Sequence, residues 1–187
     1  MRPVKAARFR MIRWVALSLV CYQVGTAQPR AGEVVVRGTY TNADYGYSVV
    51  IPERMKATRM SAPAPQHGIV INLDHAALWV NAEYNSLARS LDGLAQTVVD
   101  DWFPGDEFRM KTKTPLSLAG LPALDVVLER RLEPGQMGSA HFVVALRAVP
   151  GEVGIVYTIL VKGSDETAAA QKLFSRIVES FRLTDVK

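Results

Sequence analysis

The chain has 187 residues, of which 49% are hydrophobic and 21% are charged, the composition of a folded globular protein of one domain or a domain with a tail. Its single cysteine excludes a disulfide scaffold and a zinc site built from several thiolates. The formal net charge is +4, but five of the 22 basic residues and none of the 18 acidic ones lie in residues 1–27. The rest of the chain therefore lacks a basic surface, and we expect no nucleic-acid partner.

Residues 1–27 have the pattern of an export signal. A positively charged flank ends at Arg13, an apolar run follows over residues 14–22, and small residues precede a cleavage site after Ala27. The apolar run is too short for a stable membrane span, which needs roughly 20 residues. We therefore expect a periplasmic or secreted protein without a stable membrane span once the signal is cleaved. Retention as an uncleaved anchor and lipidation at Cys21 remain as alternatives.

Residues 28–40 are expected to be a leader with a possible first strand at 34–36, and residues 41–187 to be a single α+β domain. Strands are predicted where apolar residues alternate or β-branched residues cluster, over 45–51, 68–73, 77–84, 124–128, 141–148 and 153–162. Residues 53–66 and 133–138 are predicted to be loops, and residues 107–118 a weakly patterned extended stretch.

Two amphipathic helices are predicted. The first has an apolar face with helical spacing, formed by Leu87, Leu91, Leu94, Ala95, Val98 and Trp102. Ser86 or Ser90 can cap its start, and Pro104 ends it. The second starts at Ser164–Asp165 and places Leu173, Ile177 and Phe181 on one face. The last strand is nearly all apolar, which indicates that both of its faces are covered. Runs of strands joined by short turns indicate a mostly antiparallel sheet, and the two helices can cover its two faces.

Three short motifs, in this order along the chain, resemble the Mog1/PsbP-type α/β/α sandwich of exported bacterial proteins. They are Tyr-Gly-Tyr-Ser-Val-Val-Ile-Pro at 45–52, Gly-Leu-Pro-Ala at 120–123 and Phe-Ser-Arg-Ile-Val-Glu-Ser-Phe at 174–181. The resemblance spans about residues 40–185 and implies the fold. Families with this fold include an extrinsic subunit of the oxygen-evolving photosystem and a nuclear transport factor that binds a small GTPase. The resemblance thus implies binding or assembly without a shared catalytic residue set, and fold alone does not give function.

No residue pattern indicates a reaction, a cofactor or a metal. His67 and His75 could meet across a hairpin with Asp74 and suit zinc or iron, but their spacing matches no ligand signature, so solvated loop histidines are favoured. Ser139 and His141 could pair as nucleophile and base, but a third orienting group and a nucleophile elbow are missing from the sequence pattern.

Two adjacent acidic residues, Asp100 and Asp101, fall at the C-terminal end of the first helix, where the helix dipole disfavours negative charge. They could mark a cation or partner site. An exposed acidic helix end is the favoured interpretation, because the penalty there is small.

The expected function is an exported, non-enzymatic binding or assembly module of the cell envelope. It would present a sheet edge or the 53–66 loop to an envelope protein, and the residues assigned to this surface are Met55, Met60, Pro63, Pro65 and Trp79. The alternative is a small-ligand carrier or weak hydrolase with a pocket between sheet and helix. That pocket would be lined by Tyr45, Tyr47, Tyr84 and Tyr157.

Overall fold

A computed structural model describes residues 34–60, 67–104, 108–131, 137–163 and 168–186. These residues belong to one structural unit, Ala31–Lys187. The predictions made for the export signal at 1–27, for Pro63 and Pro65, and for the helix start at Ser164–Asp165 lie outside the described residues.

An eight-stranded sheet forms the centre of this unit, and every neighbouring pair of its strands is antiparallel. From one edge to the other, the strands are β1 (Val35–Val36), β4 (Ala57–Arg59), β5 (Gly68–Asn72), β6 (Ala76–Tyr84), β10 (Ile155–Gly163), β9 (Met137–Arg147), β8 (Leu121–Arg131) and β7 (Phe108–Leu118). Strand β10 is buried from Ile155 to Val161. The apolar run in the sequence therefore corresponds to a central strand covered on both faces, as predicted.

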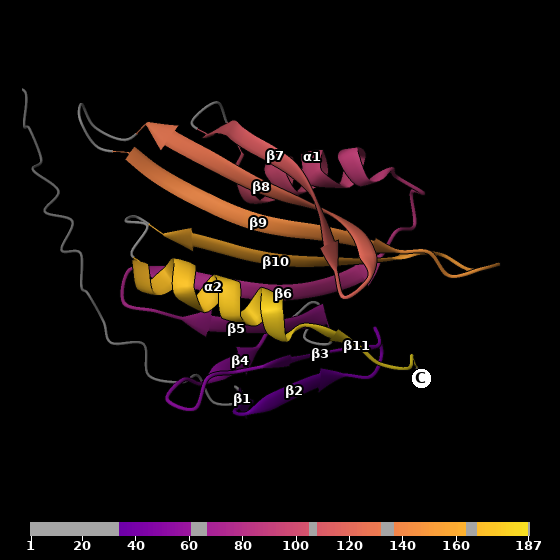
Figure 1. Cartoon of the computed structure of the whole chain (residues 1–187), viewed down its shortest axis with the longest axis horizontal. Helices are drawn as coiled ribbons and strands as arrows, with labels where there is room; N and C mark the ends of the chain where they lie inside the picture. The colour runs from indigo at the N-terminus through magenta and orange to yellow at the C-terminus, as the bar shows by residue number, and fades with distance from the viewer. Residues whose placement is uncertain (1–33, 61–66, 105–107, 132–136, 164–167, 187) are drawn as a thin grey trace, which may run out of the picture. The chain divides into compact units, whose positions relative to one another are not determined.

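Helices α1 (Leu91–Trp102) and α2 (Ala168–Ser180) cover opposite faces of this sheet (Figure 1). Successive side chains of a strand point to opposite faces, so each central strand supplies both cores. Ile159 of β10 packs in the core beneath α2, and its neighbour Leu160 packs in the core beneath α1. The predicted α+β architecture with two helical covers is confirmed.

A second, three-stranded sheet packs against the core beneath α2. Its order is β11 (Arg182–Leu183), β3 (Tyr47–Val50) and β2 (Thr39–Asn42). The predicted alternation over 45–51 is confirmed, because the odd-numbered side chains are all buried, namely Tyr45, Tyr47, Val49 and Ile51. The turn between β2 and β3 is closed by Asn42, whose Oδ1 accepts hydrogen bonds from the backbone N–H groups of Asp44 and Tyr45, each at 3.2 Å.

Two sequence expectations need correction. The predicted loop at 53–66 contains strand β4, which pairs with β1 on one side and β5 on the other. The first helix begins at Leu91, with Ser90 as its N-cap, so Leu87 precedes the helix and is 70% exposed instead of contributing to the buried face. The reason is local: the Asn85 side chain accepts from Arg89 N–H and donates to Arg89 C=O, both at 2.9 Å, which fixes a turn there.

Among the described residues, no helix is long and apolar enough to cross a membrane. The weakly patterned stretch at 107–118 forms β7, the long outer strand of the main sheet.

Candidate binding groove between helix α1 and the central strands

A polar row interrupts the apolar face that β6 and β10 turn toward α1. Leu160 lies opposite Trp79 in the register, and both pack in the core beneath α1. Two residues further along, Thr158 lies opposite Asn81, and after another two, Val156 lies opposite Glu83. Residues directly opposite in an antiparallel pair share a face. The register therefore brings Asn81, Thr158 and Glu83 together beside the helix.

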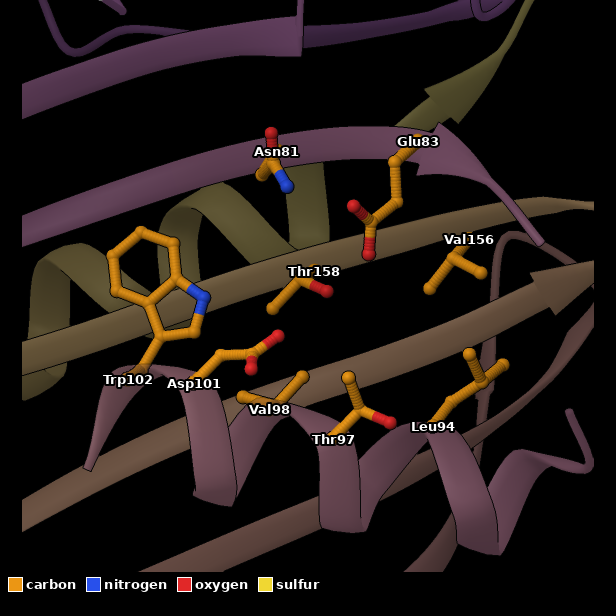
Figure 2. A pocket seen from close by; sticks show the side chains of 9 residues that line it. All are labelled: Asn81, Glu83, Leu94, Thr97, Val98, Asp101, Trp102, Val156 and Thr158. Atoms are coloured by element: carbon orange, nitrogen blue, oxygen red, sulfur yellow. The ribbon is translucent and has the colours of Figure 1, made fainter. Parts of the chain in front are cut away.

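Helix α1 and these two strands enclose a hollow of about 50 Å³. It is lined by Asn81, Glu83, Leu94, Thr97, Val98, Asp101, Trp102, Val156 and Thr158 (Figure 2). The carboxylates of Glu83, from β6, and Asp101, from α1, point toward each other across Thr158. The indole of Trp102 closes one end, and Leu94 with Val156 closes the other.

Several side-chain polar groups that line the hollow have no hydrogen-bond partner among the described residues. Thr97 is satisfied, because its Oγ1 donates to Gly93 C=O at 2.9 Å and accepts from Arg89 Nη1 at 2.5 Å. Thr158 is only 5% exposed, yet its hydroxyl has no hydrogen-bond partner in the part of the chain that the structure describes. Asn81 Oδ1 is a fully buried atom without a hydrogen-bond partner there. Buried polar groups are normally hydrogen-bonded, so such groups need an explanation.

The hollow opens into a wider surface. An adjoining depression of about 250 Å³ shares Glu83, Leu94 and Asp101 with it and is further lined by Tyr84 and Leu87. Beyond this lies an open depression of about 540 Å³ that includes Val153. Tyr84, Leu87 and Val153 are 52%, 70% and 48% exposed. We call the hollow and these two depressions the α1–β6 groove.

The residues assigned from the sequence to a partner surface do not form one surface among the described residues. Met55 is half-buried against the core beneath α2 and lines a separate depression with Val50 and Arg176. Trp79 packs on Trp102 with ring centroids 5.3 Å apart, on the opposite face of the main sheet. Met60 is half-buried, and its backbone N–H donates to Gly68 C=O at 3.0 Å. Of these three, Trp79 is the one that adjoins the α1–β6 groove.

The tyrosines expected to line a pocket fill the core instead. Tyr47 and Tyr157 are fully buried, and both pack against Phe181, at 5.6 and 5.3 Å between ring centroids. Tyr157 Oη donates to Tyr45 C=O at 2.8 Å. Burial raises the pKa of the Tyr47 hydroxyl well above its ordinary value. Tyr84 alone of the four is exposed, and it contacts Tyr45 at 5.2 Å.

The structure shows the side-chain contacts of His141 and His67. The two ring nitrogens of His141 lie 2.5 Å from Asp125 Oδ1 and 3.1 Å from Gln171 Oε1, and its ring packs on Phe174. These contacts tie β9 to β8 and α2, and Asp125 is an orienting group for His141 that the sequence pattern did not reveal. His67 packs edge-on against Tyr45. Within the described residues, no three His, Cys, Asp or Glu side chains lie close enough together to hold a metal ion.

The sequence marks Asp101, with Asp100, as a possible cation site, but it marks neither Glu83 nor Thr158. Two weak signals were present. Glu83 and Asn81 occupy the face of their strand opposite the apolar residues Leu78, Val80 and Ala82, and Thr158 is a polar residue within an apolar run. Neither signal identifies the strand pairing that brings them together.

The fold and the groove together define a two-helix α+β sandwich with a polar recess under one helix. No protein-family model matches the sequence, and no curated protein matches it. Solved structures with the same fold include LpqN of Mycobacterium tuberculosis, described as involved in cell envelope biogenesis, with TM-score 0.55, 14% identity, and coverage of 80% of this chain and 91% of that one.

Two further solved structures have the same fold. Cyanobacterial PsbP (CyanoP) from Synechocystis sp. PCC 6803 gives TM-score 0.54 at 15% identity, with coverage of 86% and 98% of the two chains. The Ran-binding protein Mog1p of Saccharomyces cerevisiae gives TM-score 0.52 at 12% identity, with coverage of 82% and 96%. The chain has the Mog1/PsbP-like fold, as its sequence motifs predict.

Proposed function

We propose that this chain is an exported, non-enzymatic binding module of the cell envelope and that it binds a protein partner through the α1–β6 groove. The observation that carries the proposal is the groove itself: unpaired polar groups in a recess, with the exposed apolar side chains of Leu87 and Val153 at its open end. Exposed apolar side chains gathered beside polar groups are typical of a protein contact surface.

The size of the recess disfavours the alternative functions. A pocket that buries a small molecule usually measures about 300–1,000 Å³, whereas the hollow under α1 measures about 50 Å³. It has no room for a sugar ring or a lipid chain between Glu83 and Asp101. The two larger depressions that continue it are open, which suits contact with a macromolecular surface better than enclosure of a ligand.

The outer strand β7 is a weaker candidate for the partner surface. Exposed edges that avoid pairing carry lysines, prolines and bulges. Strand β7 has Lys113 and Pro115, and its register with β8 shifts at Lys111. These features oppose addition of a partner strand to β7 and favour the groove over this edge of the sheet.

Export to the envelope is supported by the signal-like residues 1–27 and by the description of LpqN, which shares the fold. The description of Mog1p as a Ran-binding protein supports a protein partner for a module of this shape. Mass spectrometry of the secreted or periplasmic protein should give a mature N-terminus at Gln28. A retained N-terminus or a lipid on Cys21 would contradict cleavage after Ala27.

The binding surface can be tested by placing a photo-activated cross-linking residue at three exposed or half-exposed positions, one at a time, in cells that export the protein. Leu87 reports on the groove, Ser117 on the sheet edge and Met60 on the 53–66 loop. We expect a discrete cross-linked species from position 87 and none from positions 117 and 60. A species from position 117 or 60 alone would assign binding to the edge or the loop and overturn the groove.

A further inference from the structure

From the chemistry of its lining, we infer that the α1–β6 groove accepts the ammonium group of a lysine side chain from the partner. This inference rests on the proposed function and specifies what the groove recognises. Glu83 and Asp101, both exposed residues, line one hollow from opposite walls and direct their carboxylates toward each other. Neither forms an ion pair or hydrogen bond within the described residues. Two converging carboxylates without a counter-ion attract a cation.

A second observation is independent of the acidic pair. Thr158, a residue that is 5% exposed, lines the same hollow, and its hydroxyl has no hydrogen bond to another described group. An ammonium group donates three hydrogen bonds and accepts none. The two carboxylates and the Thr158 oxygen supply three acceptors. A half-turn of the Asn81 amide would add its unpartnered Oδ1 without breaking a hydrogen bond of the described residues.

The C-terminal end of α1 already holds one ammonium group of the chain itself. Lys162 Nζ donates to Trp102 C=O at 3.0 Å and lies 4.9 Å from the Phe103 ring centroid. The negative end of the helix dipole favours cations at this position. Trp79 and Leu160 lie between Lys162 and Thr158 in the strand register, so Lys162 does not occupy the hollow.

Size and surroundings favour lysine over arginine and over a free amine. The hollow of about 50 Å³ is small beside an ordinary ligand pocket, which suits a compact ammonium head better than a planar guanidinium. The alkyl stem would leave along Leu94 and Val156 toward the depression beside Leu87. The same depression is lined by Arg89. A free diamine would bring its second positive charge beside that guanidinium, whereas a lysine side chain brings only its apolar stem.

The direct test uses n-butylammonium as a lysine side-chain probe and follows the indole N–H resonance of Trp102 by NMR, because that nitrogen faces the hollow. We expect saturable binding of n-butylammonium, and no equivalent shift with n-butanol, which has the same stem without the charge. Asp101→Asn and Glu83→Gln should each weaken binding about tenfold, since each removes one charge-assisted hydrogen bond. Thr158→Val should weaken it by about threefold.

The matched control is Asp100→Asn. Asp100 neighbours Asp101 and carries the same charge, but it accepts from Gln96 Nε2 at 2.9 Å and does not line the hollow. This variant should bind n-butylammonium within about twofold of the parent protein, because Asp100 lies outside the hollow and acts on the bound cation only through screened solvent. Equal weakening by Asp100→Asn and Asp101→Asn would reduce the effect to general electrostatics and overturn the site.

Two further probes decide the occupant. Nα-acetyl-lysine N-methylamide should bind at least as tightly as butane-1,4-diamine, and n-butylguanidinium should bind more weakly than n-butylammonium. Tighter binding of the diamine would show that the groove binds a free amine and would overturn the lysine side chain as its occupant. Equal binding of n-butylguanidinium would overturn the preference for lysine over arginine. Cross-linking from position 87 without n-butylammonium binding would overturn this inference while leaving the proposed function intact. The reverse result would leave the cation site and remove the protein partner.

Discussion

At the scale of single residues, two glycines have opposite roles that the sequence alone does not distinguish. A Cβ at position 68 would lie 1.8 Å from the Val80 carbonyl oxygen, so Gly68 is required where β5 passes β6. A Cβ at position 93, in the first turn of α1, would lie 3.4 Å from Ser90 Oγ, an ordinary contact. Only the packing around each glycine, which comes from residues distant in the sequence, separates the two cases.

Gly68→Ala should therefore lower the free energy of unfolding by more than about 3 kcal/mol or prevent folding, because the backbone of β6 cannot yield to the new methyl group. Gly93→Ala should raise it by about 0.5–1 kcal/mol, because alanine loses less conformational freedom than glycine on forming a helix. Urea unfolding followed by circular dichroism measures both. A tolerated alanine at position 68 would contradict the close approach of these two strands.

The candidate site shows the same dependence on distant residues. Asp101 was suspected from its place at a helix end, which is a local property. Its partner carboxylate on Glu83 and the hydroxyl of Thr158 come from strands that are far apart in the sequence and adjacent in the sheet. A one-residue change in that register would turn Asn81 and Glu83 to the other face. The sequence can therefore nominate one wall of the groove and leaves the other undetermined.

At the scale of elements, strong periodicity was predictable and short elements were not. The positions of β6, β10 and α2 follow from alternating or helical apolar patterns over nine or more residues. Strand β4 has three residues, and β2 is the four-residue run Thr-Tyr-Thr-Asn. Such runs carry too little pattern, and they become strands because neighbouring strands offer them hydrogen bonds. Leu87 was misassigned because its spacing from Leu91 is helical, while the Asn85 turn decides where the helix begins.

The start of α1 rests on Ser90, whose Oγ accepts a hydrogen bond from Gly93 N–H at 3.2 Å. Ser90→Ala should lower the free energy of unfolding by about 1 kcal/mol, because it leaves an N–H group of the first turn without its acceptor. Ser90→Asp keeps an acceptor and adds a negative charge at the positive end of the helix, so it should restore most of the loss. Failure of aspartate to restore stability would contradict a capping role.

Strand β7 is the outer strand whose 11 residues leave one side of the main sheet unpaired. The double substitution Lys111→Val with Pro115→Val should promote concentration-dependent self-association, because it removes a charge and a backbone that cannot donate a hydrogen bond. Light scattering after size-exclusion chromatography measures the mass of the species. The conservative control Lys111→Arg, which keeps Pro115, should stay at the mass of the parent protein. Self-association of both variants to the same extent would contradict the role of Lys111 and Pro115 in preventing strand pairing at β7.

At the scale of the whole unit, the two faces of one sheet perform different tasks. The face beneath α2 is a continuous apolar core that joins both sheets through Tyr47, Tyr157 and Phe181. The face beneath α1 is apolar over β8 and β9 and turns polar at β6. The unpartnered polar groups of the groove therefore lie on the α1 side of the sheet, outside the core beneath α2. This division is why groove substitutions such as Asp101→Asn should spare the fold.

The buried tyrosines make stability depend on alkaline pH. Burial raises the pKa values of Tyr40, Tyr47 and Tyr157 above the ordinary 10.0, most strongly for Tyr47. The folded chain then holds these protons more tightly than the unfolded chain, so their contribution is complete below about pH 10 and is lost as the pH rises through the folded pKa values. We expect the free energy of unfolding to be level near about pH 8 and to fall above about pH 10, by up to about 1.4 kcal/mol per pH unit for each such tyrosine.

Absorbance of tyrosinate and urea unfolding across this range measure ionisation and stability together. Tyr47→Phe keeps the stacked ring, removes one ionisable group and should make the alkaline decline shallower, whereas full ionisation of every tyrosine near pH 10 with the fold intact would contradict the buried cluster.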